Sequence, residues 1–101
     1  MKGLRIFYLG NCPYCRKAKT ALTELKNENP DFERVGIEWI EESISPKIAD
    51  SYDYYRVPCV YSGDEKLYEC RPGDDFDEIK RQLEKALKYA PEESLYTRSK
   101  P

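Results

Sequence analysis

Two cysteines separated by two residues stand where the sequence pattern changes from that of a strand to that of a helix. Cys12 and Cys15 follow a short apolar run over residues 4–9, interrupted only by Arg5, which is typical of a strand covered on both faces. They precede a segment whose apolar residues recur on one helical face. Thiols at this spacing at a helix start lie on the same side of one turn and can form a disulfide. The sequence therefore predicts a strand, a cysteine pair that cycles between dithiol and disulfide, and a helix.

The start of this helix favours different states for the two thiols. Pro13 suits the first helical position, where its missing N–H is not needed and its fixed φ favours the helix. Cys12 is then the N-cap residue, next to unpaired backbone N–H groups and the positive end of the helix dipole. Further positive charge follows one turn later, on Arg16, Lys17 and Lys19. We expect Cys12 to be the attacking thiolate and Cys15, inside the turn, to keep its proton.

Two other uses of such a pair are a static disulfide and half of a zinc site. A static disulfide is typical of secreted proteins, and we expect no secretory segment because the apolar stretch is short and broken by Arg5. Zinc needs four ligands, and the sequence has no histidine and no second closely spaced cysteine pair. The pattern favours redox chemistry, and we expect a cytoplasmic protein.

Composition indicates one small domain. The 101 residues are 40% hydrophobic and 36% charged, which provides apolar material for one core but too little for two. No stretch approaches the apolar length that spans a membrane, and a formal net charge of -2 provides no basic surface for nucleic acid. We expect a monomeric domain over residues 1–90 and a flexible polar tail over residues 91–101. Its expected partners are proteins or small thiols.

The predicted fold is α/β, with a four-stranded mixed sheet and helices on both faces. The first crossover makes two strands parallel, with the strand at residues 4–9 in a central position, and a later hairpin adds an antiparallel pair. Ser45 and Asp74 are predicted to cap the second and third helices. The predicted elements, in order, are strand 4–9, helix 13–27, strand 35–39, helix 46–55, strands 57–61 and 66–70, and helix 75–90.

Three separated motifs resemble those of one known family. Cys12-Pro13-Tyr14-Cys15 is similar to the active site of dithiol glutaredoxins, and Arg56-Val57-Pro58 is similar to their Thr-Val-Pro, whose proline is cis. Gly73-Asp74-Asp75 lies where the family often has an acidic pair opening the last helix. The chain thus resembles the glutaredoxins of the thioredoxin superfamily over residues 3 to 90. This resemblance implies a thioredoxin-like fold and a thiol–disulfide oxidoreductase, reduced by glutathione or by a flavoprotein disulfide reductase.

The resemblance also implies a substrate site around the catalytic Cys12 and Cys15. A proline that begins a strand leaves neighbouring backbone groups unpaired, so Val57 can pair with an extended substrate while Cys12 attacks its sulfur. The ordinary alternatives are an edge-strand proline, exposed tyrosine and arginine side chains, and a helix cap at Asp74. The expected substrate-binding residues are Tyr14, Arg56, Val57, Pro58, Arg71, Asp74 and Asp75.

Departures from the family pattern bear on the substrate. Leu9 occupies the position of a lysine that helps the family hold a carboxylate of glutathione, and Arg71-Pro72 replaces a Gly-Gly pair. Arg56 or Arg71 can supply a bidentate carboxylate anchor instead. Protein disulfides and glutathione mixed disulfides are therefore both candidate substrates, with glutathione as a co-substrate and no bound cofactor.

Two further cysteines lie outside the motif. Cys59 follows Pro58 directly and is expected near the active pair, where it can face Cys70 across the hairpin. We expect both to behave as small buried hydrophobes, with a resolving thiol or a soft-metal ligand as the alternatives. The competing functions are a metal- or iron–sulfur-binding module without redox turnover and an inactive scaffold. No metal ligands are assigned.

Overall fold

Strand β1 (Gly3–Tyr8) lies inside a four-stranded mixed sheet of order β2-β1-β3-β4. It pairs in parallel with β2 (Gly36–Glu41) and antiparallel with β3 (Cys59–Ser62), which forms a hairpin with β4 (Glu65–Glu69). This computed structural model describes residues 3–89, so the predicted tail over residues 91–101 lies outside the described residues. The inner position predicted for the first strand and the mixed sheet are both confirmed.

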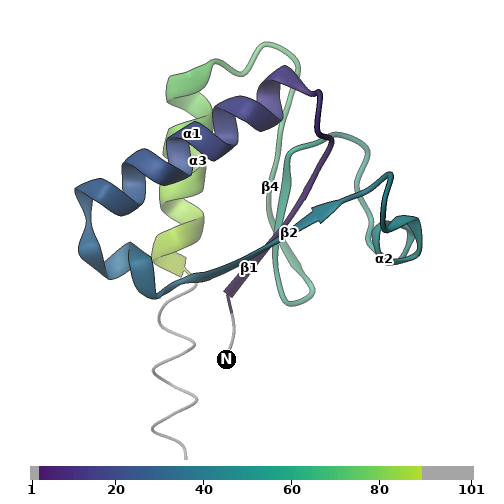
Figure 1. Cartoon of the computed structure of the whole chain (residues 1–101), viewed down its shortest axis with the longest axis horizontal. Helices are drawn as coiled ribbons and strands as arrows, with labels where there is room; N and C mark the ends of the chain where they lie inside the picture. The colour runs from purple at the N-terminus through teal and green to yellow at the C-terminus, as the bar shows by residue number, and fades with distance from the viewer. Residues whose placement is uncertain (1–2, 90–101) are drawn as a thin grey trace, which may run out of the picture.

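Helices cover both faces of the sheet (Figure 1). Helices α1 (Pro13–Glu28) and α3 (Phe76–Tyr89) share one face, and the short α2 (Pro46–Asp50) lies against the other. Successive side chains of a strand point to opposite faces, so β1 sends Ile6 into the core under α1 and α3 and Phe7 into the core under α2. Both side chains are fully buried, which explains why adjacent residues of this strand are apolar.

The larger core lies between the sheet and the two long helices. Its helical residues recur at intervals of three and four, as predicted, because only one stripe of each helix faces the sheet. In α1 they are Ala18, Ala21, Leu22 and Leu25, and in α3 they are Ile79, Leu83, Ala86 and Leu87. The predicted end of the last helix, residue 90, lies outside the described residues.

The second helix is shorter than predicted. It ends at Asp50 instead of residues 54–55, because the Ser51 hydroxyl and the Ser51 N–H both donate to the carbonyl of Ile48. The chain then turns so that Tyr52 and Tyr54 pack on the ring of Phe7, with centroid distances of 4.8 and 4.9 Å. Ile48, in the middle of this short helix, is 39% exposed.

Two other elements differ from the prediction. A short 3-10 helix, η1 (Pro30–Arg34), stands between α1 and β2; Asn29 caps it by accepting a hydrogen bond from the N–H of Asp31. The strand predicted at residues 57–61 begins at Cys59, after the cis Val57–Pro58 peptide bond. No element was predicted over residues 28–34, where η1 forms.

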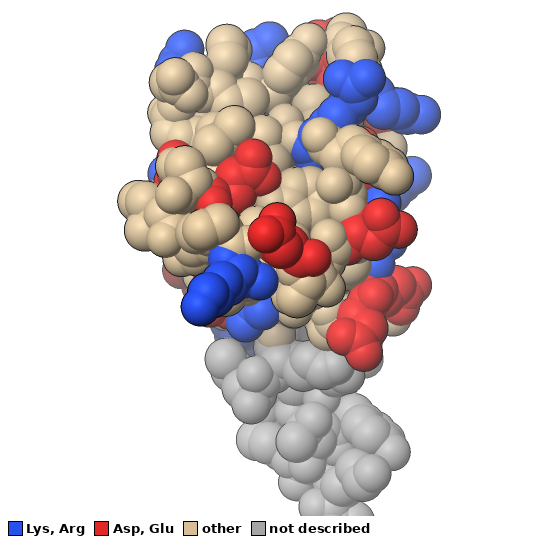
Figure 2. Space-filling model, turned by 90° about the vertical axis from the view of Figure 1, so that its right-hand side faces the viewer, with Lys and Arg blue, Asp and Glu red and all other residues tan. Residues whose placement is uncertain are grey.

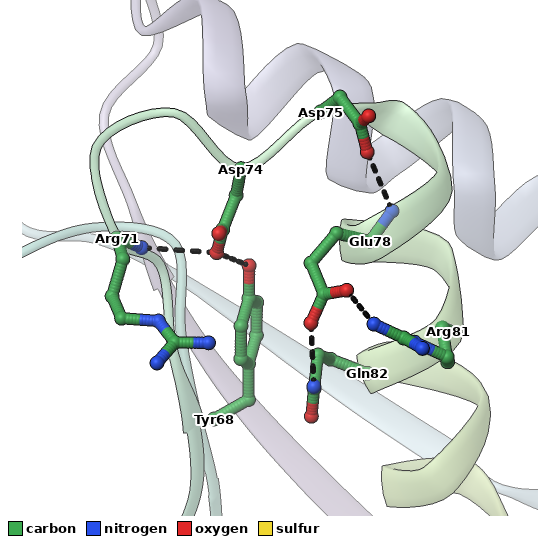
Figure 3. Close-up of polar contacts among 7 residues, drawn as sticks. All are labelled: Tyr68, Arg71, Asp74, Asp75, Glu78, Arg81 and Gln82. Atoms are coloured by element: carbon green, nitrogen blue, oxygen red, sulfur yellow. Dashed lines mark hydrogen bonds and ion pairs between the residues drawn. The ribbon is translucent and has the colours of Figure 1, made fainter.

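The last helix is capped by Asp75 and not by the predicted Asp74 (Figure 3). The Asp75 carboxylate accepts a hydrogen bond from the N–H of Glu78 at 2.9 Å, and its carbonyl accepts one from Ile79 at 3.0 Å. Asp74 instead faces the preceding turn and Tyr68. The helix starts one residue later than expected because Phe76 packs against the larger core as its first residue. Ser45 precedes α2 at the predicted cap position, but its side chain forms no capping hydrogen bond.

Candidate active site

The cysteine pair lies at the N-terminal end of α1, directly after β1. The N–H of Cys12 donates to the carbonyl of Leu9 at 3.2 Å, and the carbonyl of Cys12 accepts the first hydrogen bond of the helix, from Arg16. Cys12 is the N-cap residue with an extended backbone, and Pro13 is the first helical residue, as predicted. Cys12 is partly exposed, and its sulfur lies 3.9 Å from the carbonyl oxygen of Val57.

Cys15 is buried beneath Cys12, with 2% of its surface exposed. Burial, and to a smaller extent a hydrogen bond with the Cys12 side chain, raises the pKa of the Cys15 thiol to about 12. The two free thiols therefore differ in exposure. Cys12 is partly exposed at the N-terminal end of a helix, whereas Cys15 is buried and keeps its proton at neutral pH.

Glu41 holds the turn that leads into the motif. Its carboxylate accepts hydrogen bonds from the N–H of Gly10 at 2.9 Å and from the N–H of Ser43 at 2.8 Å. The Ser43 hydroxyl, followed by the Gly10 N–H, lowers the pKa of this carboxyl. Glu41 was not predicted as a site residue. Its position at the end of a strand parallel to β1 could have indicated this role, because parallel strands end at the same edge of a sheet and Glu41 pairs with Tyr8.

The loop beside Cys12 contains the cis Val57–Pro58 peptide bond, as expected. Glu69 of β4 fixes the start of this loop by accepting hydrogen bonds from the N–H groups of Tyr55 and Arg56, at 2.6 and 2.7 Å. Burial acts against the charge of Glu69, but the Lys66 ammonium at 2.8 Å and these two donors outweigh it and lower its pKa. Glu69 was also missed, because only the hairpin pairing brings it next to the loop.

Asp74 organises the loop after β4 (Figure 3). Its carboxylate accepts hydrogen bonds from the Tyr68 hydroxyl at 2.7 Å and from the N–H of Arg71 at 3.1 Å. The Tyr68 hydroxyl lowers the pKa of Asp74, and burial together with this hydrogen bond raises the pKa of Tyr68. Gly73 completes the turn with a φ of 91°, which a side chain would strain. The Asp74 carboxylate thus already has two hydrogen-bond donors within the protein.

Tyr14 connects the cysteine motif to this loop. Its hydroxyl accepts a hydrogen bond from the N–H of Gly73 at 3.1 Å, and its ring packs against the larger core. The ammonium of Lys17 lies 5.4 Å from the centre of the ring. The structure therefore brings the motif and the loop over residues 71–75 together through Tyr14, which was expected only to contact substrate.

Arg56 and Arg71 are both exposed. Arg56 belongs to the loop that Glu69 holds, and Arg71 belongs to the loop that Asp74 holds. Neither guanidinium forms a salt bridge with a side chain of residues 3–89. Asp75 is exposed but is used as the cap of α3. The two arginines thus present charge to solvent from the backbone segments that Glu69 and Asp74 hold.

The extra cysteines lie on opposite faces of the sheet. Cys59 is fully buried in the core under α2, whereas Cys70 belongs to the core under α1 and α3. The expectation that Cys59 can face Cys70 across the hairpin is wrong, because side chains alternate along β3 and the residue opposite Cys59 is Glu69. Cys70 is the thiol on the face of Cys15, close enough to contribute to its raised pKa. The expected burial of both is confirmed.

Within residues 3–89, no group of three or more acidic, cysteine or histidine side chains is arranged to hold a metal ion. No helix in that part of the chain is both long and apolar enough to cross a membrane.

Comparison with known proteins adds a likeness in fold. No protein-family model matches the chain, and no curated protein is similar enough to match. Among solved structures, the chain is similar to one described as the crystal structure of a designed protein. The two share 25% sequence identity over 85% of this chain and 76% of the other, with a TM-score of 0.56. This likeness supports the α/β architecture.

Proposed function

We propose that this protein is a glutaredoxin-like thiol–disulfide oxidoreductase with a thioredoxin-like fold. The observation that carries the proposal is an accessible thiol, Cys12, at the N-terminal end of a helix, beside a buried thiol, Cys15, whose pKa is raised to about 12. The cis Val57–Pro58 bond next to Cys12 and the mixed sheet with helices on both faces support the assignment.

The first step joins the substrate to the enzyme. The Cys12 thiolate attacks one sulfur of a substrate disulfide, so that the substrate S–S bond breaks and a Cys12–substrate mixed disulfide forms. The other substrate sulfur leaves as a thiolate and takes a proton. An extended substrate lies along the backbone of Val57, whose carbonyl oxygen is 3.9 Å from the attacking sulfur.

The second step releases the substrate. Cys15 loses its proton to the departing thiolate or to water, and its sulfur attacks the sulfur of Cys12. The bond between Cys12 and the substrate breaks, the substrate has gained two electrons and two protons, and a Cys12–Cys15 disulfide remains. A two-electron thiol donor, either glutathione or a flavoprotein disulfide reductase, then restores the dithiol. We assign this cycle to a cytoplasmic monomer.

The experiment that tests the function compares two disulfides. The purified dithiol protein is given a glutathione mixed disulfide and a protein disulfide, and the reduction of each is followed with time. We expect Cys12→Ser to abolish reduction of both. We expect Cys15→Ser to accumulate the mixed disulfide, visible by mass spectrometry, or to retain only removal of glutathione.

A matched control is Cys59→Ala, which removes a thiol on the opposite face of the sheet. It is expected to leave both activities unchanged. Full activity of Cys12→Ser or complete dithiol turnover by Cys15→Ser would refute the assignment. Inactivity on both disulfides, with stoichiometric metal or a coloured cluster in anaerobically purified protein, would instead favour the metal-binding module.

A further inference from the structure

A pocket next to the cysteine motif lies on the face of the sheet that carries α2. Its volume is about 470 Å³, and its lining includes three tyrosines, two carboxylates and the leucine that precedes the motif. These residues are Tyr52, Tyr54, Tyr55, Glu42, Asp50 and Leu9. Leu9 accepts the hydrogen bond of the Cys12 N–H, and Tyr55 stands two residues before Val57. The pocket therefore adjoins both segments that flank the reactive sulfur.

The pocket carries negative charge without a basic residue in its lining. The Tyr54 hydroxyl donates to the Glu42 carboxylate at 2.5 Å, and Asp50 lies close enough to add to the raised pKa of Tyr54. Neither carboxylate forms a salt bridge with the lysines and arginines of residues 3–89. Figure 2 shows the face that carries α2, where acidic side chains lie in the middle among uncharged residues, with basic side chains below them and along one side. A cation entering here meets uncompensated negative charge.

The tyrosines give the pocket preformed aromatic walls. Tyr52 and Tyr54 both pack on the buried ring of Phe7, which holds them in place. Tyr55, which also lines the pocket, is 91% exposed, so its ring is accessible to a partner. Faces of aromatic rings attract lysine and arginine. The guanidinium of Arg5, 5.6 Å from the centre of the Tyr52 ring, is a cation that this chain already places against one of these rings.

Resting on the proposed function, we propose that this pocket binds a lysine or arginine side chain of a protein substrate, a few residues from the disulfide that Cys12 attacks. A lysine or arginine has the length and charge to pass between tyrosine rings and reach Glu42 and Asp50. A carboxylate in the same place would be repelled. The preferred substrate is therefore a basic segment of a protein disulfide, ahead of glutathione, whose carboxylates meet Leu9 and two acidic side chains here.

The test uses three disulfides with the full-length dithiol protein. Two are peptides of equal length joined to the same leaving thiol, one with lysines and one with glutamates flanking its cysteine, and the third is the neutral bis(2-hydroxyethyl) disulfide. We expect kcat/KM for the basic peptide to exceed that for the acidic peptide by about tenfold or more at low salt. The preference should shrink as the ionic strength rises.

The double variant Glu42→Gln/Asp50→Asn keeps the shape of the pocket and removes its charge. We expect it to lower kcat/KM for the basic peptide by about tenfold, the order at which paired charges change association, while leaving the neutral disulfide unaffected. The control variant Asp31→Asn/Asp64→Asn removes the same charge from exposed positions outside the pocket lining. It is expected to preserve the preference.

The outcomes separate this inference from the function on which it rests. Failure to reduce even the neutral disulfide would overturn the oxidoreductase assignment and the inference with it. Reduction of the neutral disulfide, together with equal rates for the two peptides, would overturn only the proposal that the pocket binds a basic side chain. A preference for the acidic peptide would also overturn the role of the pocket, and would indicate Arg56 or Arg71 as the anchor.

Discussion

Access to water is the physical difference between Cys12 and Cys15, and it determines how each thiol responds to pH. Burial raises the pKa of Cys15 to about 12. At neutral pH we therefore expect iodoacetamide to alkylate Cys12 in the native protein and Cys15 only after denaturation, with mass spectrometry identifying the labelled site. Equal labelling of both thiols in the native state would contradict the burial on which their separate roles depend.

The buried thiols also make stability depend on pH. Burial raises the pKa of Cys59 from 9.0 to about 12, so the folded state holds this proton more tightly than the unfolded state does. Above pH 9.0 the unfolded chain loses the proton first, and the free energy of unfolding falls by up to about 1.4 kcal/mol per pH unit for such a group. Urea denaturation under reducing conditions should show a shallower fall for Cys59→Ala. Parallel curves for the two proteins would argue against a protonated Cys59.

Glu69 is the residue whose charge positions the substrate loop. In Glu69→Gln the neutral side chain loses the Lys66 ion pair and weakens the hydrogen bonds from Tyr55 and Arg56. We expect the free energy of unfolding to fall by about 1 kcal/mol, and kcat/KM for a protein disulfide to fall more than the rate of Cys12 alkylation.

The matched control for that variant is Glu84→Gln, which removes a carboxylate whose partner, Lys88, is largely exposed. Surface pairs of this kind contribute between about 0 and 1 kcal/mol. A loss of kcat/KM in Glu84→Gln as large as in Glu69→Gln would show that net charge, and not the position of the loop, governs the rate.

Among the elements, α3 offers a direct test of helix capping. Asp75→Ala removes the acceptor of the Glu78 N–H and a negative charge at the helix start, so we expect a loss of about 1 kcal/mol in the free energy of unfolding. Asp75→Asn, which keeps a capping oxygen, should lose less. The measurement is urea denaturation followed by circular dichroism. Equal losses in both variants would assign the effect to charge alone.

The start of α3 also shows the limit of reading caps from sequence. Asp74 and Asp75 are both good N-cap residues, and their order alone does not choose between them. Tertiary contacts decide which of the two caps the helix. The Tyr68 hydroxyl of β4 donates a hydrogen bond to the Asp74 carboxylate, and Phe76 packs against the larger core. Asp74, which was expected at the substrate site, thus organises the turn that contains Gly73, whose N–H donates to the Tyr14 hydroxyl.

At the scale of the whole molecule, the larger core joins both long helices to the sheet. Leu83 is fully buried in it, midway along the α3 stripe. We expect Leu83→Ala to lower the free energy of unfolding by about 2–5 kcal/mol, through lost apolar burial and the cavity left behind. Denaturation followed by both fluorescence and circular dichroism should give one coincident transition. The exposed Ile44→Ala is the control and should change the free energy little.

The sequence by itself determined the local elements and the cysteine pair. Apolar runs and helical spacing depend on neighbours along the chain, so β1, the start of α1 at Pro13 and the hairpin were predictable. Tertiary structure decided which residues far apart in the chain meet. Pairing between strands brought Glu41 to Gly10 and Glu69 to the loop at residues 55–56, and it sent Cys59 and Cys70 to opposite faces. Side chains alternate along a strand, so a shift of one residue in register reverses each face, and no local pattern carries that register.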